Sequence, residues 1–344
     1  MKTQRSVLVM IMSVLRAARI GRTILEAGES KFSVCAYGNT GAYKRSIEIE
    51  GDNEFRLGVD TLALYNVLKS IGGKYVEIKA TETAVILSSD GRQSQIQAST
   101  EGPLHLPVPA GTTEVEVIPD AAAEVMNFLQ VSTGEFGFGD VRLDSAGLAC
   151  ASDSSSLYVT PFLKVPDEVG SVMVPVSGLF PVTRLTGSLT ARVLPAAILF
   201  IGDGGKELFM SPLSTRPDPG FSQVLSRFQG EAPVFPFPLG QIGQEIETLA
   251  SVVGKEQLAQ VTISEGNGVV KATGHETVRF ESKFETDSLL EVEFTVKPRS
   301  YLKISSLFQE QVDLVSHTES HLFFKEGERR GVISCEARSV VIKK

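Results

Sequence analysis

The chain has 344 residues, of which 42% are hydrophobic and 22% charged, and its formal net charge is −8. That length exceeds one ordinary core and predicts two or three domains, and the apolar content excludes a disordered chain. The acidic balance argues against nucleic acid binding unless the cations gather on one surface.

The first predicted element is a helix over residues 6–20, because apolar residues recur there at 3.6-residue spacing. Lys2 and Arg5 before this run resemble the start of a signal peptide, but further arginines follow within two turns and no small-residue cleavage site is present. No other segment approaches the roughly 18–20 apolar residues that span a bilayer. We therefore expect a helix with one buried face and no membrane segment.

Further along the chain, a strand followed by a helical stretch occurs three times, at residues 55–73, 172–187 and 292–309. Two alternating strands follow each copy and are joined by an Asp-Gly or Glu-Gly pair, which is typical of a hairpin turn with positive φ. The glycines of these turns are Gly91, Gly204 and Gly327.

Helical stretches at residues 6–20, 120–132 and 239–253 precede these copies and are followed by strands of their own. The chain is therefore predicted to hold three similar domains, each with two helices and about eight strands. Proline and glycine cluster near residues 109–111 and 231–238, which places the domains at 1–110, 111–230 and 231–344.

Motifs for catalysis, metal binding or cofactor binding are weak. HTESH (317–321) has its glutamate misplaced for a zinc helix and precedes a strand, so a hairpin loop is favoured over a metal site. The serine run at 154–156 lacks a GxSxG elbow, although a hydrolase remains an alternative. Cys35, Cys150 and Cys335 are widely spaced and predict reduced thiols in a cytoplasmic protein. We expect no metal and no cofactor.

Cations concentrate on the predicted helices and beside them, whereas acids fall largely in strands and turns. These cations belong either to solvated helix faces or to surfaces that meet a phosphate backbone without reading bases. The residues concerned are Lys2, Arg5, Arg16, Arg19, Arg22, Lys69, Lys74, Arg184, Arg299 and Lys303.

The order of elements, the threefold repeat and several local runs resemble the bacterial DNA polymerase III beta subunit, the DNA sliding clamp family. The resemblance spans the whole chain and is clearest from Thr113 to Leu225 and in the C-terminal third. ASDSSSLYV (151–159) occupies the place of the family's threonine-aspartate-glycine-histidine-arginine-leucine run. DPGFSQVL (218–225) is similar to a family stretch that ends in valine-leucine.

The resemblance implies an α+β fold of three clamp domains, which close a ring as a head-to-tail homodimer around duplex DNA. The implied function is a non-catalytic processivity factor that tethers a DNA polymerase and a clamp loader through short linear peptides. A clamp-fold platform for transcription or repair factors is the alternative. The implied location is the bacterial cytoplasm, or the host cytoplasm for a phage-encoded member.

The resemblance implies two further sets of functional residues in this chain. The dimer interface is expected to use Ile96 and Ala98 against Val252 and Val253. A partner-peptide cleft is expected between the second and third domains. Its residues would be Phe136, Ser152, Ser154, Ser155, Ser156, Leu157, Pro219, Gln223, Val224, Val340 and Ile342.

Several of these positions depart from the family pattern. Ser155 and Ser156 stand where the family has histidine and arginine, and Gln223 replaces an arginine. These changes remove charge and bulk from the cleft, so we expect it to take a different partner peptide or to bind the usual one weakly. Ala98 is smaller than the family residue, which leaves the strength of the dimer open. The departures suggest a divergent member of the family, of bacterial, phage or plasmid origin.

Overall fold

A computed structural model describes residues 1–28, 30–49, 54–102, 106, 112–133, 137–228, 235–272, 280–288 and 290–342. The chain packs into two compact units. The first contains Met1–Met126, Leu143–Gly147 and Phe162–Thr215, and the second contains Asn127–Arg142, Leu148–Pro161 and Arg216–Lys344. Residues 109–111 and 231–234, where domain boundaries were expected, lie outside the described residues, so the division into three domains stays a prediction.

The first unit is built on one twelve-stranded sheet, whose described strand pairs are antiparallel. In spatial order the strands are β1 (Lys2–Gln4), β6 (Tyr75–Ala80), β7 (Ala84–Ser89), β8 (Arg92–Thr100), β5 (Phe55–Asp60), β2 (Arg22–Ala27), β3 (Lys31–Gly38), β4 (Gly41–Glu48), β16 (Glu207–Pro212), β15 (Ala197–Gly202), β14 (Thr190–Val193) and β9 (Glu114–Glu116). The strand β13 (Ser171–Pro175) also belongs to this unit.

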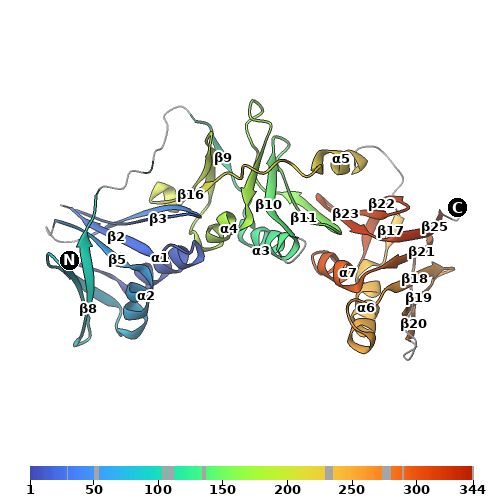
Figure 1. Cartoon of the computed structure of the whole chain (residues 1–344), viewed down its shortest axis with the longest axis horizontal. Helices are drawn as coiled ribbons and strands as arrows, with labels where there is room; N and C mark the ends of the chain where they lie inside the picture. Colours follow the sequence, from blue (N-terminus) through green and yellow to red (C-terminus); the bar gives the residue numbers. More distant parts are fainter. Residues whose placement is uncertain are drawn as a thin grey trace. The chain divides into compact units, whose positions relative to one another are not determined.

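Helices α1 (Arg5–Ala17) and α2 (Thr61–Ser70) lie side by side in the first unit (Figure 1). The buried stripe of α1 has the predicted spacing and includes Leu8, Ile11 and Leu15. The carboxylate of Asp60 accepts a hydrogen bond from the Ala63 amide at 2.7 Å and caps the start of α2. The bounds and the buried stripe of α1 confirm the first predicted helix.

The second unit contains two sheets. One runs in the order β10 (Gly137–Asp144), β11 (Leu148–Asp153), β12 (Ser156–Pro161), β24 (Arg329–Ser334), β23 (His321–Glu326), β22 (Val312–Thr318) and β17 (Phe235–Phe237). The other runs in the order β20 (Glu281–Glu285), β19 (Asn267–Ala272), β18 (Ala259–Ser264), β21 (Leu290–Val296) and β25 (Glu336–Ile342).

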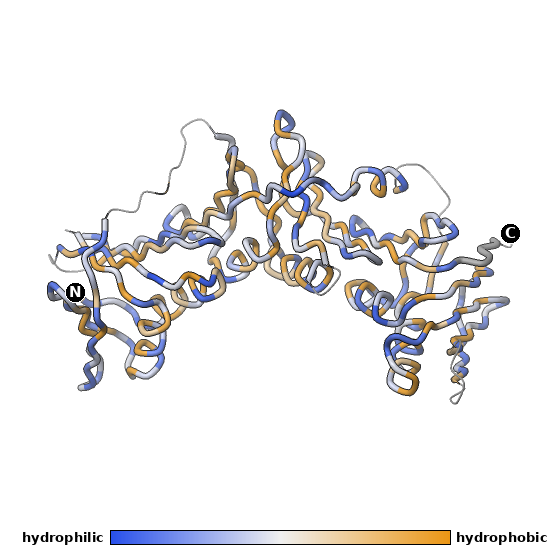
Figure 2. The backbone as a smooth tube through the Cα atoms, in the orientation of Figure 1, coloured by the Kyte–Doolittle hydropathy of each residue, from blue (hydrophilic) through white to orange (hydrophobic). Residues whose placement is uncertain are grey.

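Helices α6 (Leu239–Val253) and α7 (Pro298–Ser305) pack against each other in the second unit. The two backbones approach closely at Gly243, where an added Cβ would lie 3.1 Å from the Ser305 hydroxyl. The Tyr301 hydroxyl donates to the Leu239 carbonyl at 3.1 Å. Hydrophobic segments follow the strands and helices in Figure 2, and hydrophilic ones gather toward loops and hairpin ends.

The three predicted hairpins are confirmed: β7–β8, β15–β16 and β23–β24. Gly91, Gly204 and Gly327 have φ of 75°, 60° and 57°, the left-handed conformation that glycine adopts without steric cost. The middle turn contains the short 3₁₀ helix η2 (Asp203–Gly205).

The remaining helices are shorter or divided. The helix predicted within 172–187 is only α4 (Val176–Leu179) followed by the 3₁₀ helix η1 (Phe180–Arg184), because Pro181 cannot supply the amide that continues an α-helix. The others are α3 (Ala121–Ser132), α5 (Phe221–Leu225) and the 3₁₀ helix η3 (Ser226–Phe228). Among the described helices, none is long and apolar enough to cross a bilayer.

A buried ion pair joins β4 to β16, two strands more than 150 residues apart in sequence. Arg45 and Glu207 are directly opposite each other, and their charged groups are 3.0 Å apart. The fully buried Glu207 carboxylate also accepts from the Tyr43 hydroxyl at 2.6 Å and from the amide and hydroxyl of Thr186. Burial, together with the negative Glu207, raises the pKa of Tyr43 well above its ordinary value.

Candidate functional site

The second unit contains a pocket of about 480 Å³. Four chain segments form its walls: the β11–β12 turn, α5 with η3, the β22–β23 hairpin and β24. The lining residues are Ser152, Asp153, Ser154, Ser155, Ser156, Leu157, Gln223, Val224, Arg227, Thr318, Ser320, His321, Phe323, Val332 and Ser334.

Most of the serine-rich run 151–159 is strand. Only Ser154 and Ser155 form the turn between β11 and β12. The Asp153 carboxylate accepts from the Ser155 amide at 2.8 Å, so the aspartate closes the turn through its own side chain. Strand β12 then pairs with β24, where Leu157 lies opposite Val332.

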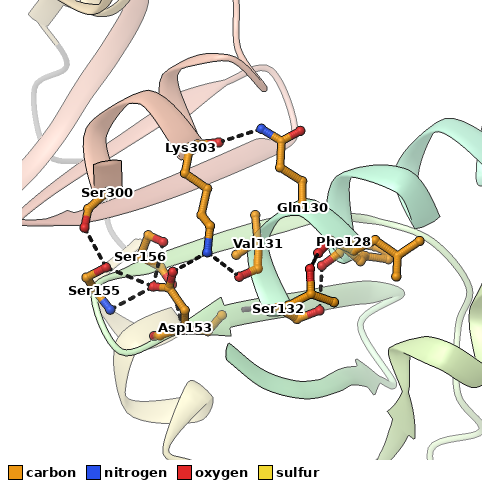
Figure 3. A network of polar contacts seen from close by, with 12 residues as sticks. Phe128, Gln130, Val131, Ser132, Asp153, Ser155, Ser156, Ser300 and Lys303 are labelled. Carbon is orange, nitrogen blue, oxygen red and sulfur yellow. Dashed lines mark hydrogen bonds and ion pairs between the residues drawn. The ribbon is translucent and has the colours of Figure 1, made fainter. Parts of the chain in front are cut away.

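Asp153 is the centre of a network of polar contacts behind this turn (Figure 3). Its Oδ1 accepts from the hydroxyls of Ser155 at 3.0 Å and Ser156 at 2.8 Å, and its Oδ2 lies 2.5 Å from the Lys303 ammonium. Burial raises the pKa of Asp153, but the hydrogen bonds from Lys303, Ser155 and Ser156 outweigh it and hold the pKa below the ordinary value of 3.8. The carboxylate is therefore ionised at neutral pH.

Lys303 connects the pocket wall to two helices. It belongs to α7, and its ammonium also donates to the Val131 carbonyl of α3 at 3.0 Å (Figure 3). The Ser300 hydroxyl, one helical turn earlier in α7, lies 2.8 Å from the Ser155 hydroxyl. The turn is thus attached to α7 at two points.

The β22–β23 hairpin forms another part of the lining. Thr318 pairs with His321, which confirms a hairpin at HTESH. The Ser320 hydroxyl lies 2.8 Å from His321 Nδ1, and burial lowers the pKa of His321. Within the described residues, no group of histidine, cysteine, aspartate and glutamate could hold a metal ion.

The apolar part of the pocket comes from Leu157, Val224, Phe323 and Val332. Phe323 packs edge-to-face against Phe228, with ring centroids 5.6 Å apart. An apolar side chain of a ligand would find its contacts with these residues.

Seven of the eleven predicted cleft residues line the pocket: Ser152, Ser154, Ser155, Ser156, Leu157, Gln223 and Val224. Pro219 is exposed ahead of α5 and is not part of the lining. Phe136 lies outside the described residues. Val340 and Ile342 pair in β25 with Val292 and Leu290, and their side chains are outside the described part. Peptide binding by these residues stays a prediction.

Sequence reasoning missed eight lining residues. Asp153 could have been found, since an aspartate followed by serines is typical of a side-chain-closed turn. The other seven lie in segments whose approach depends on long-range pairing and packing: Arg227, Thr318, Ser320, His321, Phe323, Val332 and Ser334.

Two pairs of cations lie over tyrosine rings in the first unit, one between α1 and α2 and one between β1 and the start of β6. Tyr65 has the Arg16 guanidinium 4.4 Å and the Lys69 ammonium 5.7 Å from its ring centroid. Tyr75 is flanked in the same way by Lys2 and Lys74, at 5.0 Å and 5.4 Å. Neither helix contains an acidic residue. We call Lys2, Arg16, Lys69 and Lys74 the cationic face.

The other predicted DNA-facing residues have varied surroundings. Arg5 donates to the carbonyls of Leu68 and Gly73, and Arg22 pairs with Glu101. Lys303 is held by Asp153. Three of these residues are exposed: Arg19, Arg184 and Arg299.

The predicted dimer residues also differ in exposure. Ile96 is buried within the first unit, with 6% of its surface exposed, and Ala98 is partly buried. Val252 is 53% exposed at the end of α6, next to the partly buried Val253. Their role in a dimer stays a prediction.

No protein-family model and no curated protein matches the sequence. Solved structures match its fold over nearly the whole length. A Helicobacter pylori beta clamp in complex with 3,4-difluorobenzamide has a TM-score of 0.81 at 11% identity, and the match covers 97% of this chain and 98% of the other. An H. pylori beta clamp bound to a DNA ligase peptide has a TM-score of 0.78 at 13% identity, covering 97% and 99%.

A DNA polymerase sliding clamp from Pseudomonas aeruginosa, solved with a ligand, has a TM-score of 0.79 at 14% identity and covers 97% and 98% of the two chains. The chain therefore has the fold of the bacterial beta clamps, as the sequence resemblance predicted.

Proposed function

We propose that the chain is a DNA sliding clamp, a non-catalytic ring that encircles duplex DNA and holds partner proteins through a peptide pocket. The observation that carries this proposal is the beta-clamp fold over 97% of the chain. A function based on topology requires no reacting group. In keeping with this, the Ser155 and Ser156 hydroxyls donate to the Asp153 carboxylate, and no described histidine accepts from them.

A regular pairing rule supports closure into a ring of three-domain subunits. In the three predicted domains, the fourth strand of the first, β4, pairs with the eighth strand of the second, β16. The fourth strand of the second, β12, pairs with the eighth of the third, β24. By the same rule, the fourth strand of the third domain, β20, would pair with the eighth strand of the first domain, β8, of another subunit.

Both leftover strands have an edge available for such a pairing. Strand β20 is outermost in its sheet, and the part of β8 at 92–97 pairs with β7 alone among the described strands. Pairing β20 of one subunit with β8 of the next would give a head-to-tail dimer and remove two exposed edges.

The cationic face supports an interaction with duplex DNA. Arg16 and Lys69 on Tyr65, and Lys2 and Lys74 on Tyr75, form two pairs of positive charge on a chain whose net charge is −8. Such cations attract phosphates without reading bases. Direct contacts with DNA are therefore expected mainly from the first unit.

The pocket supports a peptide-binding role. It combines an apolar side with a polar wall, an arrangement that fits a short linear peptide. The DNA ligase peptide bound to the H. pylori clamp is a precedent for such a partner on this fold. For this chain we expect the partners to be a polymerase and a clamp loader.

The test is retention on DNA. The protein is loaded onto nicked circular DNA with its cognate loader, or by mixing at high concentration, and the complex is separated by gel filtration. Retention should persist in high salt and disappear when the circle is cut, because topology and not affinity holds a ring. Equal loss from circular and linear DNA would contradict the proposal. Primer extension with the cognate polymerase separates a replicative clamp from a platform for other factors.

A further inference from the structure

Two charged residues mark the junction at which β4 pairs with β16. Arg45 and Glu207 lie directly opposite each other in the ladder. Their charged groups are 3.0 Å apart, and Asp203 of the adjoining hairpin turn also pairs with Arg45 at 3.0 Å. This junction is therefore positive on its β4 side and negative on its β16 side.

Strand register identifies the position of the third predicted domain that matches Arg45. In the first domain, four paired residues lead outward from the strand before α2: Leu57, Leu25, Val34 and Arg45. In the third domain, the same steps from the strand before α7 give Phe294, Val261, Val270 and Ser282. Leu57 and Phe294 each lie three residues ahead of the N-cap residue of the following helix. Ser282 of β20 therefore matches Arg45 of β4.

The matching position in β20 has a negative charge beside it. The Ser282 hydroxyl donates to the Glu245 carboxylate of α6. Glu245 is partly buried, and within the described residues it has no ion-pair partner. A carboxylate without a counter-charge thus lies next to the outermost strand of its sheet.

The position in β8 that matches Glu207 has a positive charge. Glu207 is the first residue of β16 after its hairpin turn, and Arg92 is the first residue of β8 after its own. Glu207 accepts from the Thr186 amide, shortly after the end of η1. Arg92 likewise contacts a helix end, since it donates to the Ser70 carbonyl of α2 at 3.2 Å. Arg92 is exposed and pairs with no acid in the described part of the chain.

The two junctions therefore have opposite polarity. At β4 and β16 the cation is on the fourth strand of a domain, whereas at β20 and β8 the cation is on the eighth. Exchanging the strands would place Arg45 opposite Arg92, or Glu245 beside Glu207. Like charges directly opposite each other destabilise a strand pair, so each exchange is disfavoured while each original pairing brings unlike charges together.

We propose that this polarity selects which strands pair, so that β8 accepts β20 of a second copy of this chain and rejects β4. In the accepted pairing, Arg92 lies opposite Ser282 of the second copy, and its guanidinium pairs with Glu245 of that copy. The inference rests on the proposed head-to-tail ring. It adds the charges that distinguish the junction between subunits from the junction within one.

The test uses two full-length variants, Ser282→Arg and Arg92→Glu. Each variant places like charges at both junctions of its own dimer. Each dimer should therefore dissociate about tenfold more readily, the combined effect of two unfavourable cross-strand pairs. Circular dichroism verifies that both variants fold.

An equimolar mixture of the two variants should restore the dimer. At one junction the introduced arginine meets the introduced glutamate, and at the other Arg92 meets Ser282 and Glu245 as in the wild type. We expect the mixed dimer to make up about nine tenths of all dimers, instead of about half for random exchange. Native mass spectrometry with one variant labelled with ¹⁵N counts the three dimers.

Ser264→Arg is the matched control. It makes the same substitution at an exposed serine of β18, an inner strand of the same sheet. Mixed with Arg92→Glu, it should give no more mixed dimer than random exchange does.

Two failures are distinguishable. If the wild-type protein is a dimer and Ser282→Arg and Arg92→Glu mix at random, or if neither variant weakens its own dimer, the polarity does not select the pairing although the ring stands. A wild-type protein that is a monomer would instead contradict the ring itself.

Discussion

At the scale of single residues, the charged groups of Asp153 and Lys303 each depend on the other as a counter-charge. Their 2.5 Å contact is largely shielded from water, with 8% and 18% of the two side chains exposed. Removing one member leaves the other buried without its counter-charge, whereas removing both leaves no unpaired charge.

We predict that Asp153→Asn lowers the free energy of unfolding at pH 7 by about 3 kcal/mol, the low end for breaking a buried pair. The double variant Asp153→Asn with Lys303→Met should be more stable than this single variant, because no buried ammonium is left unpaired. Urea denaturation monitored by circular dichroism measures both changes. A double variant that is no more stable than the single one would show that the ion pair is not the source of the loss.

The same pair predicts a dependence of stability on pH. The folded pKa of Asp153 lies below its ordinary value of 3.8, so the stabilisation is complete well above pH 3.8. It is lost as the pH falls through the folded pKa. The stability difference between the wild-type protein and Asp153→Asn should therefore shrink toward zero at the acid end of a denaturation series.

Local patterns identify residues well only when their partners are close in sequence. The Asp153–Ser155 contact spans two residues and has a recognisable turn signature. Lys303 lies 150 residues from Asp153. Its charge and helical position predicted an outward-facing cation, but only the packing of α7 beside β12 reveals its inward partner.

At the scale of elements, helices and hairpins follow from local chemistry. The periodic apolar residues of α1 and the turn glycines of the three hairpins determine structure within a few residues. Pairing between strands that are far apart in sequence does not follow from local chemistry. Strand β4 pairs with β16 and β12 pairs with β24 across long stretches of chain. Several strands have similar alternating patterns. No local signal distinguishes the correct partner.

The cationic face leads to a prediction for α1 and α2. Reversing charge with Arg16→Glu and Lys69→Glu should weaken binding to short linear duplex DNA and lower the slope of log affinity against log salt by about 2, one for each lost phosphate contact. Fluorescence anisotropy over a salt series measures the slope.

The control carries Lys164→Glu and Lys206→Glu. These lysines are exposed and ion-paired in the same unit, and the change in net charge is identical. An equal loss of affinity in the control would assign the effect to net charge, and would remove α1 and α2 from the DNA-facing surface.

At the scale of the whole molecule, ring closure requires two copies of the chain. Sedimentation equilibrium should give a species of twice the 37.0 kDa subunit mass at micromolar concentration. Val252→Asp should shift the equilibrium toward monomer, because it places a charge on an exposed apolar residue of the predicted interface. Leu258→Asp, also on an exposed apolar residue of the second unit, should leave the dimer intact. A wild-type protein that sediments as a monomer would contradict a stable ring.

The clamp fold was predictable because three weak repeats in the same order reinforce one another, although residues 1–55 match the family only in pattern. The separate residue sets were less predictable. Ile96 is buried in the first unit, since the alternation of β8 directs it to the core, and its role at a subunit contact stays a prediction. Position in a repeat indicates the element, while the direction of each side chain depends on the strand that pairs beside it.

In the first unit, the pairing of β4 with β16 in the twelve-stranded sheet does not depend on the chain segment that connects the two halves of the sheet. Strands β4 and β16 are held by ladder hydrogen bonds and by Arg45 on Glu207, wherever the chain between Gly102 and Thr112 runs. A protein nicked in that interval would keep both halves of the sheet in register, as fragments that complement each other. Loss of the pairing and loss of chain continuity are therefore separate events.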